Sequence, residues 1–289
     1  MSYRIAKNLD SALEALKEKD PVTRIVAGAT DLFLQEMPAR LVDVSSIEEL
    51  TAIEEIDNRL VIGAAATHAR AAASELIKGR AAALVEACLQ VGSPQVRNIG
   101  TLGGNVVNAA PAADAAVALV ALGAKAVLVD SSGVWREEAV ARLYSSYNCS
   151  ALDGCTELLV RFLIEPCGQG EGSAFRRFAA RKALALPLAN AAARLKLENG
   201  MIASLSLVAA PVGPAPTRLI GTEAAILGKP AGEETWLLAA ETAAEEVEVR
   251  GSLLRCSAAY RRHLVGILTA DALRAAARRA AVSQSGSLT

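Results

Sequence analysis

Residues 95–105 read Gln-Val-Arg-Asn-Ile-Gly-Thr-Leu-Gly-Gly-Asn, and Pro-Ala-Ala-Asp follows at residues 111–114. The glycine pair leaves no side chain between the backbone and a bound group, and Thr101 and Asn105 flank it with polar side chains. Phosphate groups favour such small-residue turns, because several backbone N–H groups converge there. We therefore expect Thr101–Asn105 to be a phosphate-binding loop within a loop-rich segment of residues 95–114.

Another loop of the same kind lies upstream, and it is the first of the two in the chain. Arg24-Ile25-Val26 reads as a short buried strand that runs into Ala27-Gly28-Ala29-Thr30-Asp31, where Thr30 adds a hydroxyl donor. One glycine-containing turn after a strand is usually only a turn, but two in one domain can hold a pyrophosphate from both sides. The dinucleotide fingerprint GxGxxG is absent, so a Rossmann fold has no support.

The residues around these loops predict alternating strands and helices in the N-terminal half. A capping box of Ser11 and Glu14 predicts a helix over residues 10–19 that ends at Pro21. Thr67 is a suitable N-cap for a helix that follows a strand at 59–65. Further strands are expected at 24–26, 41–44, 126–129 and 158–164, a helical turn after Ser46, and helices at 81–91 and 115–122.

The C-terminal half has a different composition. Pro166–Gly172 is interpreted as the boundary, a flexible hinge between two domains. Asn199-Gly200 predicts a hairpin between strands 193–197 and 202–209. Helices are expected at 223–227, 235–247, 258–268 and 270–281, followed by a disordered tail at 283–289. The predicted fold class is α+β with two domains.

Composition excludes several classes of partner. The 289 residues carry 30 Lys plus Arg against 31 Asp plus Glu, so no net positive charge favours nucleic acid or an anionic membrane. The most apolar stretch, residues 115–124, is half of the roughly twenty residues that a membrane-spanning helix needs. The N-terminus lacks the apolar run of a signal peptide. Five cysteines without a CxxC pair fit reduced thiols, so a cytoplasmic protein is expected.

The run from Gln95 to Asp114 resembles the flavin loop of the molybdenum hydroxylase FAD subunits, which include the medium subunit of aerobic carbon monoxide dehydrogenase and the FAD portion of xanthine dehydrogenase. The resemblance extends over nearly the whole chain, through Val26–Leu32, Ala174–Leu184, Thr217–Lys229, Val249–Ser252 and Tyr260–Leu264. It implies a PCMH-type FAD-binding domain with two subdomains, then a C-terminal domain of a small antiparallel sheet plus helices. The corresponding limits are 1–166 for the first domain, with subdomains at about 1–50 and 51–166, and 173–282 for the second.

The resemblance also implies which residues contact FAD. Ala27–Asp31 and Thr101–Asn105 would line the pyrophosphate and ribose, Asp114 is similar to a position near the adenosine half, and Val91-Gly92 to positions near the flavin. The expected set is Val26, Ala27, Gly28, Ala29, Thr30, Asp31, Leu32, Val91, Gly92, Thr101, Leu102, Gly103, Gly104, Asn105, Asn108 and Asp114. No catalytic residue and no metal ligand is expected in this chain.

Two positions depart from the family pattern. Ala29 replaces the usual second glycine, which is harmless at negative φ and costs about 1 kcal/mol if the turn requires φ > 0. Leu188 occupies the place of a lysine that approaches FAD in the xanthine dehydrogenase branch. Residues 27–31 contain no His or Cys, so FAD is expected to bind noncovalently.

The implied role is electron transfer. In the family, a large subunit with the molybdopterin cofactor acts on the substrate, a small subunit with [2Fe-2S] clusters relays electrons to or from FAD, and FAD meets an external acceptor such as NAD. One alternative is a stand-alone PCMH-type flavin oxidoreductase. The other is a non-enzymatic scaffold subunit that has lost FAD. The intact Gly103-Gly104-Asn105 and Asp114 favour the FAD subunit.

Three further features have competing interpretations. Cys149, Cys155 and Cys167 are too few and too irregularly spaced for an iron–sulfur cluster, so incidental thiols are expected. The glycines of 168–172 favour a hinge over a phosphate loop, because Glu171 would repel an anion. The basic cluster of Arg176, Arg177, Arg181 and Lys182 is either a contact for a partner subunit or a solvated face.

Overall fold

A small parallel sheet forms the N-terminal end of the molecule. The computed structural model describes residues 2–18, 23–34, 39–252 and 255–285. The order of this sheet is β1 (Ser2–Ile5), β3 (Arg40–Asp43) and β2 (Thr23–Val26). Helix α1 (Leu9–Leu16) packs against it through Ala12, Ala15 and Leu16, which belong to the same apolar cluster as Val42. The loop at residues 27–31 follows β2, an edge strand of this sheet, and therefore lies at the edge of the packed sheet and helix.

A second, antiparallel sheet follows in the chain. Its order is β4 (Ile53–Ile56), β5 (Arg59–Gly63), β10 (Glu157–Ile164), β6 (Lys125–Asp130) and β7 (Trp135–Ala139). The short helix α2 (Glu48–Thr51) precedes it, η1 (Leu32–Leu34) and η2 (Val140–Leu143) are single 3-10 turns, and β8 (Tyr144–Ser146) pairs with β9 (Cys149–Ser150) in a separate hairpin. The strands expected at 59–65, 126–129 and 158–164 are all present, with ends that differ by a few residues.

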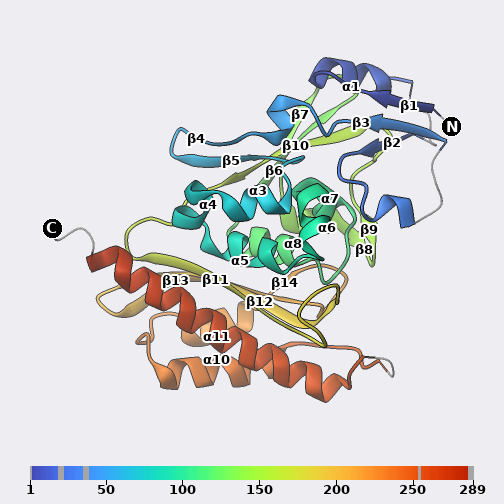
Figure 1. The fold of residues 1–289 in the computed structure, drawn as a ribbon. Helices are drawn as coiled ribbons and strands as arrows, with labels where there is room; N and C mark the ends of the chain where they lie inside the picture. The colour runs from blue at the N-terminus through green and yellow to red at the C-terminus, as the bar shows by residue number, and fades with distance from the viewer. Residues whose placement is uncertain (1, 19–22, 35–38, 253–254, 286–289) are drawn as a thin grey trace.

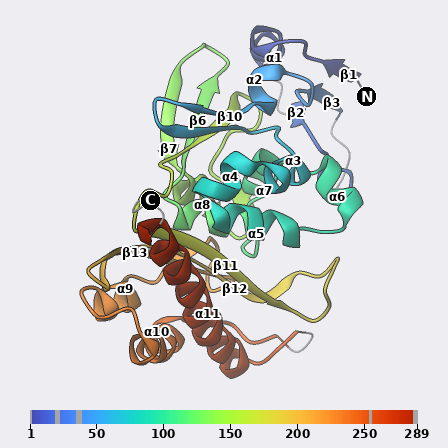
Figure 2. The same ribbon diagram turned by 60° about the vertical axis from the view of Figure 1, so that its left-hand side comes forward.

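Helices fill the middle layer between this sheet and the next one (Figures 1 and 2). They are α3 (His68–Ala73), α4 (Glu75–Arg80), α5 (Ala82–Gln90), α6 (Pro94–Ile99), α7 (Leu102–Val107) and α8 (Asp114–Ala121). All eight residues of α8 are buried, which explains why this stretch is apolar on every side. None of the described helices is long and apolar enough to cross a membrane.

The C-terminal part is a four-stranded antiparallel sheet covered on one face by helices (Figure 1). Its order is β11 (Glu171–Ala179), β12 (Pro187–Glu198), β13 (Met201–Ala210) and β14 (Thr217–Arg218), and its helices are α9 (Ile220–Ile226), α10 (Glu233–Glu246) and α11 (Ala258–Ser285). The predicted hairpin is confirmed: Asn199 and Gly200 both have positive φ, 51° and 76°, as a tight two-residue turn requires. The α+β class is confirmed as well.

Several predicted elements were wrong in detail. Residues 95–114 are not simply loop-rich, because they contain nearly all of α6 and the whole of α7. The helices predicted at 258–268 and 270–281 are one helix, α11, which also contains residues 283–285 of the predicted disordered tail. Helix α1 is capped by Asn8, whose side chain accepts from the Ser11 N–H, so the capping box is Asn8 with Ser11 and not Ser11 with Glu14. The predicted stop at Pro21 and residues 286–289 lie outside the described residues.

The segment expected to be a flexible hinge is held in place. The Arg194 guanidinium donates to the carbonyl oxygens of Glu165 and Pro166 and to the Glu171 carboxylate. Glu171 already belongs to β11, and a Cβ at Gly172 would lie 2.1 Å from the Ala276 carbonyl oxygen of α11. The glycine at 172 therefore permits close packing of strand on helix, not flexibility.

Arg177 joins the C-terminal sheet to the middle layer. Its side chain is only 6% exposed, and its Nε lies 3.4 Å from Oδ2 of Asp114 at the start of α8. The guanidinium also donates to the carbonyl oxygens of Gln90, at 2.7 Å, and Ala185. Asn190 of β12 donates to the same Asp114 carboxylate at 2.8 Å. Both interpretations of the basic cluster, partner contact and solvated face, are thus wrong for Arg177, because it is buried within its own chain.

This buried contact predicts that mutations in the basic cluster lower the free energy of unfolding by different amounts. Replacing Arg177 leaves the Asp114 carboxylate and two carbonyl groups without their cation, so Arg177→Met is expected to lower the free energy of unfolding by about 3 kcal/mol. Arg181 is exposed, and among the described residues it donates only to the nearby Leu184 carbonyl, so Arg181→Met should change the free energy of unfolding by less than about 1 kcal/mol. Urea unfolding of both variants tests this, and equal losses would contradict it.

Candidate functional site

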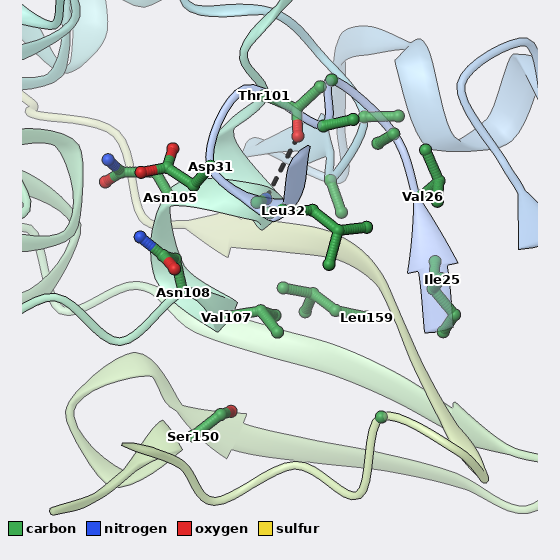
Figure 3. A pocket seen from close by; sticks show the side chains of 18 of the residues that line it. Ile25, Val26, Asp31, Leu32, Thr101, Asn105, Val107, Asn108, Ser150 and Leu159 are labelled. Carbon is green, nitrogen blue, oxygen red and sulfur yellow. Dashed lines mark hydrogen bonds between the residues drawn. The ribbon is translucent and has the colours of Figure 1, made fainter. Parts of the chain in front are cut away.

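A cavity of about 580 Å³ lies where the parallel sheet meets the middle layer of helices. This size is typical of small-molecule and cofactor sites. Residues 26–32 line it, and so do Thr101, Gly103, Gly104, Asn105 and Asn108. The two loops that the sequence predicted therefore face one common space. Figure 3 shows Asp31, Asn105 and Asn108 together on one side of it, with Leu32, Val107 and Leu159 forming an apolar side.

The first loop, residues 27–31, packs directly on the segment that leads into the second loop, residues 101–105. A Cβ at Gly28 would lie only 2.2 Å from the Ile99 carbonyl oxygen and 2.8 Å from Cα of Gly100, so no other residue fits at position 28 without movement of the backbone. On the far side, a Cβ at Gly103 would lie 2.7 Å from the Ala64 carbonyl oxygen at the end of β5. The two glycines therefore allow three backbone segments to lie in contact and to form one wall of the cavity.

The first loop has free hydrogen-bond donors. Within the described part of the chain, the backbone N–H groups of residues 28–31 donate to no acceptor, although the Ala29 and Asp31 carbonyl oxygens accept from Phe33 and Leu34. Ala29 has φ +53°, in the left-handed region. A left-handed residue in such a turn directs successive N–H groups to the same side and creates an anion-binding concavity. The first loop can therefore bind a phosphate group through its backbone.

In the second loop, unlike the first, the backbone N–H groups of residues 102–104 already have hydrogen-bond partners within the chain. The N–H groups of Leu102 and Gly103 donate to the Ala66 and Ala64 carbonyl oxygens at 3.0 and 2.7 Å. The Gly104 N–H donates to Oγ1 of Thr101, the N-cap of α7, at 3.1 Å (Figure 3). Because these donors already have partners, the expectation that N–H groups of residues 102–104 are available to a phosphate was wrong. The contribution of this loop is the exposed, side-chain-free surface of Gly104 and the side chain of Asn105, whose Oδ1 accepts from the Ala116 N–H at 3.3 Å.

The remaining predicted residues divide into two groups. Val26, Ala27, Leu32, Val91 and Asn108 line the cavity with the two loops. Leu102, Gly92 and Asp114 do not line it: Leu102 is fully buried in the core, Gly92 accepts a hydrogen bond from Leu184, and Asp114 lies in the contact with Arg177. Burial raises the pKa of Asp114 to about 6, although Arg177 and the Asn190 amide act in the opposite direction.

Sequence reasoning missed two parts of the cavity wall. The β8–β9 hairpin and the residues after it contribute Asn148, Cys149, Ser150, Asp153 and Cys155. His68, the first residue of α3, lines the cavity beside the first loop. No local pattern in the sequence marks these residues, since they reach the cavity only through the tertiary fold. The five cysteines are free thiols, and the described residues contain no group of three or more side chains placed to hold a metal ion.

Comparison with known proteins assigns the chain to a family. One family model, the FAD binding domain in molybdopterin dehydrogenase, matches residues 1–164, and a second, the CO dehydrogenase flavoprotein C-terminal domain, matches residues 173–276. The chain is 29% identical to a putative xanthine dehydrogenase FAD-binding subunit of Escherichia coli (strain K12), over 93% of both proteins. It is 30% identical to the nicotinate dehydrogenase FAD-subunit of Eubacterium barkeri, over 79% of this chain and 80% of that protein.

The fold agrees with this assignment. A solved structure of carbon monoxide dehydrogenase from Hydrogenophaga pseudoflava superposes with a TM-score of 0.89 at 26% identity, over 96% of this chain and 98% of that one. Since the first family model covers more than half of the 289 residues, this chain belongs to the FAD-binding subunits of the molybdopterin dehydrogenase family. It is an oxidoreductase subunit whose cofactor is FAD.

The left-handed conformation of Ala29 predicts a stabilising substitution. Glycine adopts φ +53° without the clash of a Cβ, so Ala29→Gly is expected to raise the free energy of unfolding by up to about 1 kcal/mol. Ala27 lies in the same loop but has no positive φ, so Ala27→Gly should lower the free energy of unfolding by about 0.5–1 kcal/mol through chain entropy. Urea unfolding of both variants measures the difference. A loss in both would show that position 29 carries no strain.

Burial of His68 predicts a pH dependence of stability. Desolvation, with the nearby positive charge of Arg97 as a second cause, lowers the pKa of His68 from 6.5 to about 4. The fold thus favours the neutral imidazole, so stability is fully present above pH 6.5 and is lost as the pH falls toward 4, by up to about 3 kcal/mol. Unfolding midpoints between these pH values should fall less in His68→Leu than in the wild type. His263 is exposed, so His263→Gln should retain the wild-type profile; equal profiles for all three proteins would contradict the prediction.

Proposed function

We propose that this chain binds FAD noncovalently in the cavity between residues 27–31 and 101–105, and that it is the electron-transfer subunit of a molybdenum-containing dehydrogenase complex. The observation that carries the proposal is the set of N–H groups at residues 28–31, which have no partner among the described residues and lie at the same cavity as the exposed surface of Gly104. A diphosphate group needs such a combination of donors and close approach.

Different parts of the cavity lining suit different parts of FAD. The diphosphate would lie on the backbone of residues 28–31. The side chains of Asp31, Asn105 and Asn108, grouped in Figure 3, can hydrogen-bond ribose hydroxyls. The apolar side with Leu32, Val107 and Leu159 is suited to an aromatic ring system. Asn105 is held through its bond to Ala116, so this binding group is oriented before the cofactor arrives.

FAD, when bound, supplies the redox chemistry, and the protein supplies binding, orientation and exclusion of water. Relatives such as the nicotinate dehydrogenase FAD-subunit are named as parts of larger enzymes. We therefore assign substrate chemistry to a partner subunit with a molybdopterin cofactor and the electron relay to a partner with [2Fe-2S] clusters. An external acceptor such as NAD would meet the flavin. The five free thiols support a reducing compartment such as the cytoplasm.

The bound cofactor itself is the first test. The purified chain is expected to show a flavin spectrum, and acid precipitation should release FAD into the supernatant because no covalent bond holds it. Retention of flavin in the pellet would contradict noncovalent binding, and it would point to His68, Cys149 or Cys155, which line the cavity. A colourless protein that FAD does not reconstitute would contradict the proposed function as a whole.

A glycine pair provides a matched test of the site. A Cβ at Gly104 would already lie 3.0 Å from Oγ1 of Thr101, and a larger side chain would enter the cavity, so Gly104→Val is expected to lower the affinity for FAD at least about 100-fold, or ~2.7 kcal/mol. Gly79 lies in α4 with no atom within 4 Å of an added Cβ, so Gly79→Val should bind FAD normally. Isothermal titration with FAD, with circular dichroism to check folding, compares them. Normal binding by Gly104→Val would place the cofactor elsewhere.

The acceptor is tested separately. If NAD is the acceptor, anaerobic addition of NADH to the FAD-loaded chain should bleach the flavin absorbance, since the reaction runs in either direction. Addition of the molybdenum subunit's substrate without that subunit should leave the absorbance unchanged. Bleaching by oxygen-free dithionite but not by NADH would exclude NAD and leave FAD binding intact.

A further inference from the structure

His68 contacts the cavity from a segment that belongs to neither loop. Thr67 caps α3 through its side chain, so His68 is the first residue of the helix, and its N–H donates to the Gly100 carbonyl oxygen at 3.0 Å. Its side chain is 2% exposed and still lines the cavity. The backbone bond fixes the imidazole behind the junction of α6 and α7, which is also where the first loop makes its closest approach through Gly28.

The imidazole has an unmet hydrogen-bonding requirement. Its Nδ1 is buried and has no hydrogen-bond partner among the described residues. Buried polar atoms in folded proteins nearly always have partners, because an unpaired one destabilises the fold. Burial holds the ring in its neutral form, which has one N–H donor and one acceptor nitrogen. An apolar residue at this position would remove the unpaired atom, so the histidine is difficult to explain by packing alone.

The neighbours of the ring show where a partner would lie. A methyl group placed at Gly100 would be 3.5 Å from Cδ2 of His68 and 3.5 Å from Oγ1 of Thr30, so the imidazole and the hydroxyl converge on the same point. Rotation of the ring by a half-turn about its Cβ–Cγ bond exchanges Nδ1 with Cδ2, which brings a nitrogen to this edge. Thr30 follows the free N–H groups of Gly28 and Ala29. A hydrogen-bond acceptor held by those groups would therefore be close to the ring.

Arg97 is the charged side chain that acts on His68. Arg97 contributes positive charge to the site, and its guanidinium donates to the Val91 carbonyl oxygen at 3.0 Å. The nearest acid of the first loop, Asp31, is exposed and accepts from the Thr30 hydroxyl at 3.2 Å. N–H groups without a partner among the described residues and an imidazole are donors that match phosphate oxygens.

We propose that His68 donates a hydrogen bond to a phosphate oxygen of the bound dinucleotide, as a third binding element beside the two loops. The proposal rests on the placement of FAD proposed above. It assigns a role to a residue that neither loop contains, and it explains why a polar side chain occupies a position with 2% exposure. In the protein without ligand, the same residue leaves Nδ1 unpaired and therefore lowers stability.

The test compares His68→Leu and His68→Asn with the wild type, using the full-length chain freed of cofactor. FAD, ADP and riboflavin serve as probes, because ADP contains the diphosphate without the flavin and riboflavin contains the flavin without phosphate. His68→Leu is expected to weaken FAD and ADP binding about tenfold, or ~1.4 kcal/mol, and to leave riboflavin binding unchanged. His68→Asn retains a donor near the position of Nδ1 and should recover most of the affinity. The thermal midpoint of ligand-free His68→Leu should be at or above that of the wild type.

Three outcomes would overturn the proposal. FAD binding to a folded His68→Leu with wild-type affinity would show that the imidazole makes no contact. Equal losses for riboflavin and ADP would show a damaged cavity and not a lost phosphate contact. In the wild type, imidazole ¹⁵N resonances of His68, assigned with His263→Gln, should shift on addition of ADP but not riboflavin; no shift would also overturn it, even if neither variant folds. Failure of the wild type to bind FAD or ADP would instead contradict the proposed function.

Discussion

Contact between backbones at Gly28 determines the geometry of the site. The first loop lies so close to Ile99 and Gly100 that a Cβ at position 28 would be 2.2 Å from a carbonyl oxygen. The antiparallel bridge between Thr67 and Thr101 and the bonds from residues 102 and 103 to the end of β5 continue the same contact. Three segments distant in sequence, around residues 28, 64–67 and 99–103, are thus brought together by main-chain atoms, which are stiffer than side chains.

The backbone N–H groups of the two loops have different roles in this arrangement. Donors of the second loop hold the structure together, since the N–H groups of Leu102, Gly103 and Gly104 all have partners within the chain. Donors of the first loop have no partner in the described part of the chain, and the left-handed Ala29 there is a local strain of about 1 kcal/mol. Nδ1 of His68, which also has no partner among the described residues, is a second such feature. Both lower stability at the place where a ligand would compensate for it, which is a common property of binding sites.

How far sequence predicted these features depends on how local each one is. The strands at 24–26 and 158–164 and the hairpin at Asn199-Gly200 follow from local patterns and were predicted correctly. Helices α6 and α7 were missed because six residues are too few to show a helical period, although the N-caps Ser93 and Thr101 were a usable signal. The burial of Arg177 and the position of His68 were not predictable, because both depend on which segments the fold brings together.

The C-terminal part holds two segments that line the cavity, which gives a physical reason for the presence of this part in an FAD subunit. Arg177 of β11 holds the Gln90 carbonyl oxygen, and the next residue, Val91, lines the cavity. Arg250 lies over the ring of Tyr147 at 5.4 Å, and the next residues, Asn148 and Cys149, also line the cavity. Two cationic side chains of the C-terminal part therefore each fix a segment that contacts the site, one through hydrogen bonds and one through a cation–π contact. If FAD binds in this cavity as proposed, its affinity depends on both arginines, although neither lines the cavity.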